Sequence, residues 1–302
     1  MISVFPKSRA MPKREITPGS PEETLSVASS ALAIIFIVCA WMLLQMLVFG
    51  NAAESRAQHI LYSTYRSELA QATAPTGALD YNGVPVKAGS PVALLNIPSL
   101  DLEQVIVDGT ASGDLLAGPG HLRNTVLPGQ QGISVVLGRA STYGAPFKNI
   151  KDLKVGDEID VQNAEAKVVY KVVDVRRAGD PIPAAPTGQQ GRLTLVTAEG
   201  SGFLSALRPS NALYVDATTA TATGVGLTAA AVPSSELVMA RDTSNLPTLA
   251  LLLGILVALV FGVSVARRHF RGVLVWSFAT PAAIALAWAV TEQVMRLLPN
   301  LM

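Results

Sequence analysis

The sequence predicts a mainly β domain outside a membrane, joined to that membrane by three transmembrane α-helices. Hydrophobic residues make up 50% of the 302 residues, charged residues only 15%, and the mean hydropathy is +0.39. An ordinary soluble domain carries more charge. The hydrophobic excess lies in three long blocks, whereas the middle of the chain holds short β-rich runs separated by turn residues.

The three apolar blocks are predicted to cross the membrane, because each has about the 20 residues that a spanning helix needs. The first, residues 28–50, follows a polar tail of residues 1–27. It is too long, and begins too late, for a cleaved signal peptide, so we predict an uncleaved anchor. The other two are residues 246–266 and 273–292. Pro281 interrupts the last block, and packing against the preceding helix would tolerate the kink.

Basic residues predict the orientation of these helices. Four Lys and Arg residues lie between positions 7 and 14, and the loop 267–272 contains the run Arg-Arg-His-Phe-Arg. Such clusters favour the cytoplasmic side. We therefore expect a multi-pass protein of the plasma membrane with a cytoplasmic N-terminus. The region between the first two spans and the tail 293–302 are then outside.

The outer region shows no sign of nucleic-acid or metal binding. Between residues 75 and 245 there are thirteen Lys and Arg against sixteen Asp and Glu, so a nucleic-acid surface is not expected. The single cysteine, Cys39, lies in the first apolar block, and His59, His121 and His269 lack the spacing of metal ligands. We predict neither a cofactor nor a metal.

The outer region divides into three parts. Residues 51–90 begin with apolar side chains at helical spacing and then become rich in Gly and Pro, which predicts a helical stalk and a linker. Residues 91–217 contain about seven β-rich runs, which favours a closed barrel or a sandwich. Residues 218–245 consist of small residues of low complexity and are predicted to be a flexible linker.

Three stretches of the β-rich domain resemble the sortases. They are GPGHLRNTVLPGQQGISVVLG (118–138), STYGAPFKNIKDLKVGDEIDV (141–161) and LTLVT (193–197). Sortases are membrane-anchored cysteine transpeptidases of Gram-positive bacteria that cut a sorting motif such as LPxTG. The resemblance is to an actinobacterial, class E-like member, and it implies a sortase-like β-barrel of eight strands over residues 91–217.

The resemblance also implies three catalytic groups, and this chain departs from the family at each position. The family's cysteine follows a TLxT strand, where this chain has Ala198. Its histidine follows the glycine of a VVIAG-like strand, where this chain has Arg139. Its arginine opens the last strand, where Ala212 stands here, although Arg208 lies four residues earlier. Covalent catalysis needs a nucleophile, an acid and an electrostatic clamp, so we expect a catalytically inactive member.

Five residues remain candidates for binding in the groove: His121, Arg139, Glu199, Phe203 and Arg208. A cation at position 139 would bind a carboxylate or pair with Glu199, and the alternative is a solvent-exposed arginine. For His121 a structural role is the favoured interpretation. Thr197 and Ser201 flank the altered site, but no histidine or lysine beside them in the sequence would activate a hydroxyl.

These observations predict an inactive sortase-like protein that binds a partner or acts as a scaffold or assembly subunit at the cell envelope. The expected partners are other envelope or membrane proteins, including a surface-protein or pilus assembly complex. Two alternatives stay open: an active, cysteine-independent transpeptidase or hydrolase, and a receptor that holds LPxTG-like peptides without cutting them.

Overall fold

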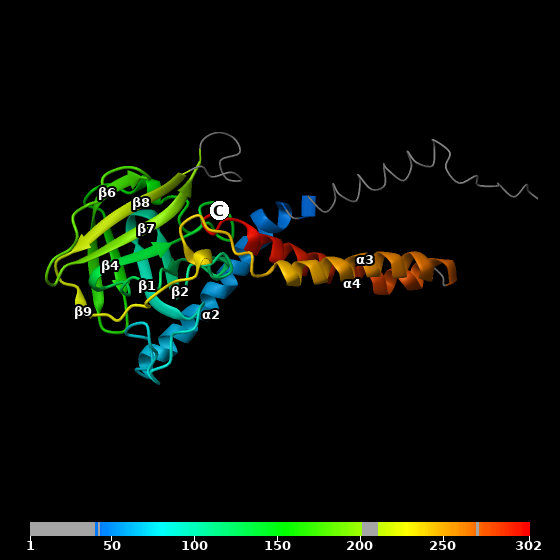
Figure 1. The fold of residues 1–302 in the computed structure, drawn as a ribbon, viewed down its shortest axis with the longest axis horizontal. Helices are drawn as coiled ribbons and strands as arrows, with labels where there is room; N and C mark the ends of the chain where they lie inside the picture. The colour runs from blue at the N-terminus through cyan, green and yellow to red at the C-terminus, as the bar shows by residue number, and fades with distance from the viewer. Residues whose placement is uncertain (1–39, 42, 201–210, 270–271) are drawn as a thin grey trace, which may run out of the picture. The chain divides into compact units, whose positions relative to one another are not determined.

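The computed structural model describes residues 40–41, 43–200, 211–269 and 272–302. Within it, residues 43–302 form one compact unit. The predicted cytoplasmic tail and most of the first predicted span lie outside the described residues, as do the candidates Phe203 and Arg208. Of the described part, the largest element is a β-barrel (Figure 1).

The barrel is a closed ring of eight strands. In ring order these are β3 (Gly120–His121), β2 (Leu102–Asp108), β1 (Pro91–Ile97), β5 (Glu158–Gln162), β6 (Lys167–Arg177), β8 (Asn211–Thr219), β7 (Gly191–Glu199) and β4 (Gln130–Leu137). Pairing of β3 with β4 closes the ring. A ninth short strand, β9 (Thr223–Val225), adds to the outside edge of β4. The structure thus decides for a barrel over a sandwich, and its shortest strands, β3 and β9, account for the difference from the expected seven.

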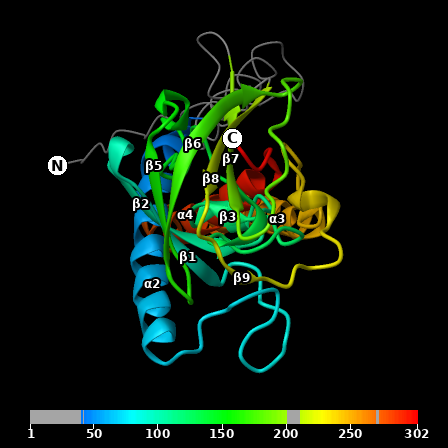
Figure 2. The ribbon, with the colours of Figure 1, turned by 90° about the vertical axis from the view of Figure 1, so that its left-hand side faces the viewer.

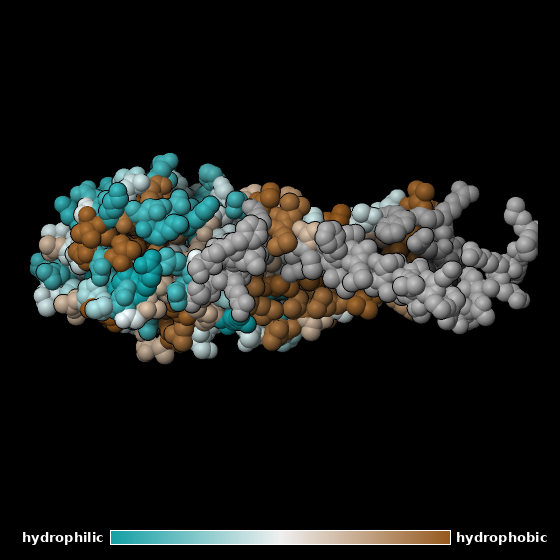
Figure 3. Space-filling model, turned by 90° about the horizontal axis from the view of Figure 1, so that it is seen from above, coloured by the Kyte–Doolittle hydropathy of each residue, from teal (hydrophilic) through white to brown (hydrophobic). Residues whose placement is uncertain are grey.

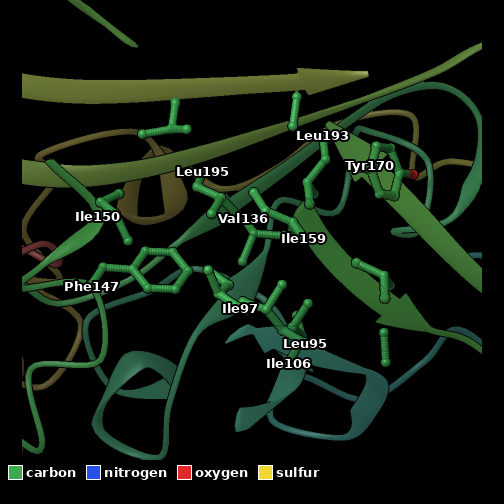
Figure 4. Packing of buried hydrophobic residues seen from close by; sticks show 14 of the residues in the cluster. Leu95, Ile97, Ile106, Val136, Phe147, Ile150, Ile159, Tyr170, Leu193 and Leu195 are labelled. Atoms are coloured by element: carbon green, nitrogen blue, oxygen red, sulfur yellow. The ribbon is translucent and has the colours of Figure 1, made fainter. Parts of the chain in front are cut away.

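Alternation along the strands sends one set of side chains into the barrel core. Large members of this core are labelled in Figure 4: Leu95, Ile97, Ile106, Val136, Phe147, Ile150, Ile159, Tyr170, Leu193 and Leu195. The opposite set at the ends of β4, β7 and β8 forms a second buried cluster that includes Leu137, Val196, Ala198 and Ala212. This second cluster positions the candidate site.

The predicted stalk is a helix that packs on the barrel. A π-helical turn (Gln45–Phe49) leads into α2 (Gly50–Ala70), which lies along β1 and β2 (Figure 2). Gln58 bonds both the N–H and the C=O of Val105, and the Tyr65 hydroxyl donates to the carbonyl oxygens of Val92 and Gln162. Since α2 supplies buried partners to barrel strands, it is part of the domain and not a free stalk.

The prediction that residues 218–245 form a flexible linker is wrong. It contributes the end of β8, strand β9 and a 3-10 turn (Ser234–Glu236). The Glu236 carboxylate is buried and pairs with Arg123, and the Glu236 main-chain oxygen accepts from the Thr110 hydroxyl. Small residues gave no periodic signal, but backbone hydrogen bonds and one buried ion pair hold the segment against the barrel.

Two helices follow, α3 (Leu246–His269) and α4 (Gly272–Leu297), and they pack against each other. Both are long and apolar enough to cross a membrane over Leu246–Val263 and Val273–Leu297. Figure 3 shows hydrophobic side chains gathered on this pair. Pro281 lies inside α4, which continues through it.

The predicted outer tail, residues 293–302, is not a free tail in the structure. Helix α4 runs on to Leu297, five residues past the predicted end of the span, and residues 298–302 then fold onto the barrel. Asn300, Leu301 and Met302 are buried. The physical reason is a set of hydrogen bonds and apolar contacts with residues far earlier in the chain, up to 190 positions away, which no local pattern reveals.

Candidate functional site

The candidate site lies where β4, β7 and β8 end side by side. Register places Ala198 of β7 directly opposite Ala212 of β8. At the end of β4, the Gly138 N–H donates to the Val196 carbonyl oxygen at 2.9 Å, and the Thr197 hydroxyl donates to the Gly138 carbonyl oxygen at 2.9 Å. Arg139 follows Gly138, so the three altered positions converge in the fold.

Two of these positions present only methyl groups. Ala198 and Ala212 are 8% and 5% exposed and belong to the second buried cluster, together with Leu115, Leu137, Val196 and Leu301. Their surroundings are therefore apolar, and neither side chain can donate, accept or attack.

Arg139 is fully buried, and both terminal nitrogens of its guanidinium donate hydrogen bonds to oxygen atoms. Nη2 donates to the main-chain oxygen and the hydroxyl of Ser112, both at 2.8 Å. Nη1 donates to the Thr142 hydroxyl at 3.0 Å and to the Met302 main-chain oxygen at 2.8 Å. The Tyr143 ring lies 5.7 Å from the guanidinium carbon, in cation–π range. Tyr143 takes a left-handed backbone conformation (φ 49°), which L-residues seldom adopt.

Burial governs the electrostatics of this arginine. None of the ion pairs among the described residues includes Arg139. Removal from water lowers the pKa of Arg139 to about 10, so the guanidinium is still protonated at neutral pH. A buried cation is costly and depends on every hydrogen bond that it makes.

Residues 298–302 complete the site. The Ala140 N–H donates to the Leu301 main-chain oxygen at 3.0 Å, and the Thr142 hydroxyl donates to that of Met302 at 2.5 Å. The Leu301 side chain packs into the cluster that contains Ala198 and Ala212. Figures 1 and 2 both place this end of the chain beside the barrel, close to β7 and β8.

Comparison with known proteins identifies the domain. Residues 95–218 match the sortase domain family. Sortase SrtE1 of Streptomyces coelicolor is 26% identical over 187 residues, which cover 58% of this chain and 51% of that protein. Sortase D of Bacillus subtilis is 28% identical over 90 residues, 30% of this chain and 44% of that protein.

Residues 95–218 of this chain form a sortase domain.

The match with these curated sortases spans about half of their own length or less. Among solved structures, the sortase D5 transpeptidase of Clostridium perfringens is 21% identical, with a TM-score of 0.42 over 55% of this chain and 97% of that one. The sortase-like barrel predicted from the sequence is confirmed, and its eight strands follow from the pairing described above.

The predicted pairing of Arg139 with Glu199 is wrong. Glu199 forms a bidentate ion pair with Arg177 of β6, at 2.6 and 3.0 Å, on the exposed side of the sortase domain. The pair lowers the pKa of Glu199. The alternative of a solvent-exposed Arg139 is wrong as well, because its side chain turns into the domain. Successive residues of β7 point to opposite faces, so Glu199 and Ala198 cannot both line the site.

His121 has a structural environment. Its Nδ1 lies 3.2 Å from Asp108 Oδ1 and its Nε2 lies 2.9 Å from the Val126 main-chain oxygen. Both ring nitrogens are thus engaged, and the residue is 2% exposed. Among the described residues there is no group of three His, Cys, Asp or Glu side chains placed to hold a metal ion.

Sequence reasoning missed four residues that the sortase site uses: Ser112, Thr142, Leu301 and Met302. The first two are hydroxyl residues in loops with no distinguishing neighbours. The last two belonged to a segment expected to be free in solvent.

Proposed function

We propose that this protein is a catalytically inactive sortase that acts by binding, as a scaffold or assembly subunit at the bacterial cell envelope. The observation that carries the proposal is that the three positions matching the family's catalytic cysteine, histidine and arginine lie together in the fold, and none holds the expected residue. Ala198, near the end of β7, is paired with Ala212, near the start of β8, and the third position holds an arginine whose Nη1 and Nη2 donate within the chain.

The remaining side chains at the site do not supply a substitute mechanism. An attacking hydroxyl needs a general base within hydrogen-bond reach. The Thr197 hydroxyl is buried and donates to Gly138, and the Thr142 hydroxyl donates to Met302. Arg139 is a cation at neutral pH and cannot accept a proton from either. A covalent acyl intermediate would have no residue on which to form within the described site.

Membrane attachment supports a role beside other envelope proteins. The two candidate spans leave most of their surface uncovered by the rest of the protein. None of the residues of Leu246–Val263 is buried, and 12% of the residues of Val273–Leu297 are buried. Such helices are available to lipid and to other membrane proteins. The proposed partners are therefore membrane or envelope proteins, with the sortase domain on the outer side.

A peptide-turnover assay on the full chain in lipid nanodiscs tests the proposal. The chain would be incubated with an LPxTG-containing peptide and an amine acceptor, and cleavage or transfer products would be measured by mass spectrometry. We expect no product above that of empty nanodiscs, while an active sortase under the same conditions gives product. Product formation that persists with EDTA and after thiol alkylation would support the cysteine-independent enzyme instead.

A further inference from the structure

We propose that the altered catalytic groove is a peptide-binding site whose ligand is residues 298–302 of the same chain, held in the manner of a substrate that is not cut. This inference concerns the same site as the proposed function. It depends on that function in one respect only, namely that the bound segment is not cleaved. The ligand class is a short peptide with an apolar side chain, recognised through its main-chain oxygens.

Two consecutive main-chain oxygens of the segment are recognised. The Leu301 oxygen accepts from the Ala140 N–H, and the Met302 oxygen accepts from Arg139 and Thr142. Main-chain contacts of this kind bind a peptide whatever its side chains are, and apolar pockets then select among sequences. The arginine that replaces the family's histidine is therefore a peptide clamp.

The pocket for the Leu301 side chain depends on the two alanines. Leu301 is fully buried among Leu115, Leu137, Val196, Ala198 and Ala212. An arginine at position 212 would bring a cation into this apolar space. The alanine at that position keeps the pocket apolar for the leucine.

Further contacts fix the approach of the segment from α4. Asn300 donates from Nδ2 to the carbonyl oxygens of Thr110 and Leu237, both at 2.9 Å, and from its N–H to Ala240 at 2.9 Å. The Ser112 hydroxyl, next to its bond with Arg139, donates to the Met295 main-chain oxygen at 3.2 Å. The docking is thus continuous from the end of α4 to Met302.

The sequence of the segment is consistent with this role. It reads Leu-Pro-Asn-Leu-Met and shares its first two residues with the LPxTG sorting motif. Its fourth residue, Leu301, is the one that packs beside Ala198. A leucine in that place keeps an apolar contact where the motif has a threonine.

Thiol reactivity at position 198 tests the proposal. In a Cys39→Ser background, Ala198→Cys would be the only thiol of the full chain in nanodiscs, and its alkylation by a maleimide would be timed. We expect slow labelling with the native segment, and labelling faster by about tenfold or more when Leu301→Asp displaces it or the chain ends at Leu297, since protection then depends on local opening. Val225→Cys, at an 81% exposed residue, should label fast in every background.

Equal labelling of Ala198→Cys with and without the segment would overturn the proposal. A disulfide between Ala140→Cys and Leu301→Cys is the second measurement, because their main chains are hydrogen-bonded. The bond should form within one chain. Formation only between two differently tagged chains, or no bond at all, would contradict docking within the chain.

The outcome is distinguishable from that of the turnover assay. If the unmodified chain cleaves peptide while Ala198→Cys stays protected by the segment, the proposed function fails and the docking inference stands. If the chain is inactive but position 198 labels at the same rate without the segment, the docking inference fails alone.

Discussion

Arg139 stands at the position where the resemblance to sortases predicts the family's histidine. A histidine at this place would exchange protons near neutral pH, whereas a guanidinium remains a donor only. In the structure, Nη1 and Nη2 of Arg139 donate to Ser112, Thr142 and the main-chain oxygen of Met302. At neutral pH the guanidinium of Arg139 is therefore a cation held by hydrogen bonds within the domain.

We expect Arg139→Ala to lower the thermal unfolding temperature strongly, with a loss of about 3 kcal/mol or more of stability, because buried oxygens are left without donors. Arg139→Lys should be intermediate, since an ammonium cannot reach the same set of acceptors. The fluorescence of the tyrosines of the barrel, in detergent, would follow unfolding. The control is Arg177→Ala, at the exposed pair with Glu199, which should leave the temperature almost unchanged. Equal effects of the two alanine variants would contradict the structural role of Arg139.

The burial of Glu54 in α2 leads to a second prediction, which concerns the pH dependence of stability. It is 5% exposed, and burial raises the pKa of its carboxyl to about 7, against the smaller, lowering effect of a hydrogen bond with Gln104. A raised pKa favours the neutral form in the folded state. Its contribution to stability is therefore fully present below about pH 4.5 and is lost as the pH rises through 7.

Replacing the carboxyl by an amide should remove this dependence. We expect the unfolding temperature of Glu54→Gln to fall less than that of the unmodified chain between pH 5 and pH 8, measured by the same fluorescence assay. The exposed Glu165→Gln is the matched control and should keep the original slope. An unchanged slope in Glu54→Gln would show that other groups cause it.

At the scale of elements, the segment between β8 and α3 behaves as part of the domain. Strand β9 pairs with β4, Ala229 donates its N–H to the Arg123 carbonyl oxygen, and Leu227 accepts from Ala78. The Glu236–Arg123 pair closes this arrangement, with the carboxylate almost fully buried. Removing one partner of a buried pair leaves the other uncompensated.

Glu236→Ala should therefore loosen the segment. Arg241 lies five residues later and offers a trypsin site. We expect limited trypsin digestion to cut after Arg241 several times faster in this variant, because proteolysis follows local opening. Mass spectrometry of the first fragments measures it, with Glu165→Ala as control. The same cutting rate in both variants would mean that the ion pair does not hold the segment.

The whole molecule constrains its own membrane topology. The segment before α3 and the segment after α4 both bond to the barrel, so both ends of this helical pair lie on the barrel's side. A pair of spanning helices meets that condition by crossing the membrane twice. We predict that the basic run 267–271 faces the opposite side, because the positive-inside tendency places such residues in the cytoplasm.

Labelling of single cysteines in intact cells checks this orientation. In the Cys39→Ser background, Val225→Cys should react with a membrane-impermeant maleimide, and His269→Cys should react only after the cells are permeabilised. The reason is that the reagent cannot cross the hydrocarbon core. Reaction of both positions in intact cells would show that the assigned orientation is wrong.

Features that depend on local pattern and composition could be predicted from the amino-acid sequence alone. Apolar length marked α3 and α4, alternation marked the long strands such as β6 and β7, and the absence of a cysteine in the domain excluded a thiol nucleophile. These conclusions need no knowledge of which segments meet. The short strands β3 and β9 could not be predicted, since two or three residues are too few to show an alternating hydrophobic pattern.

The residues that fill the site could be known only from the folded chain. The contacts of Arg139 join β4 to loops around Ser112 and Thr142 and to Met302, 163 positions later. Whether an arginine after a strand is exposed or buried depends on what covers it, and here the cover is the distant end of the chain. Glu199 was a plausible partner by sequence, but the pleat of β7 turns it to the other face, where Arg177 binds it.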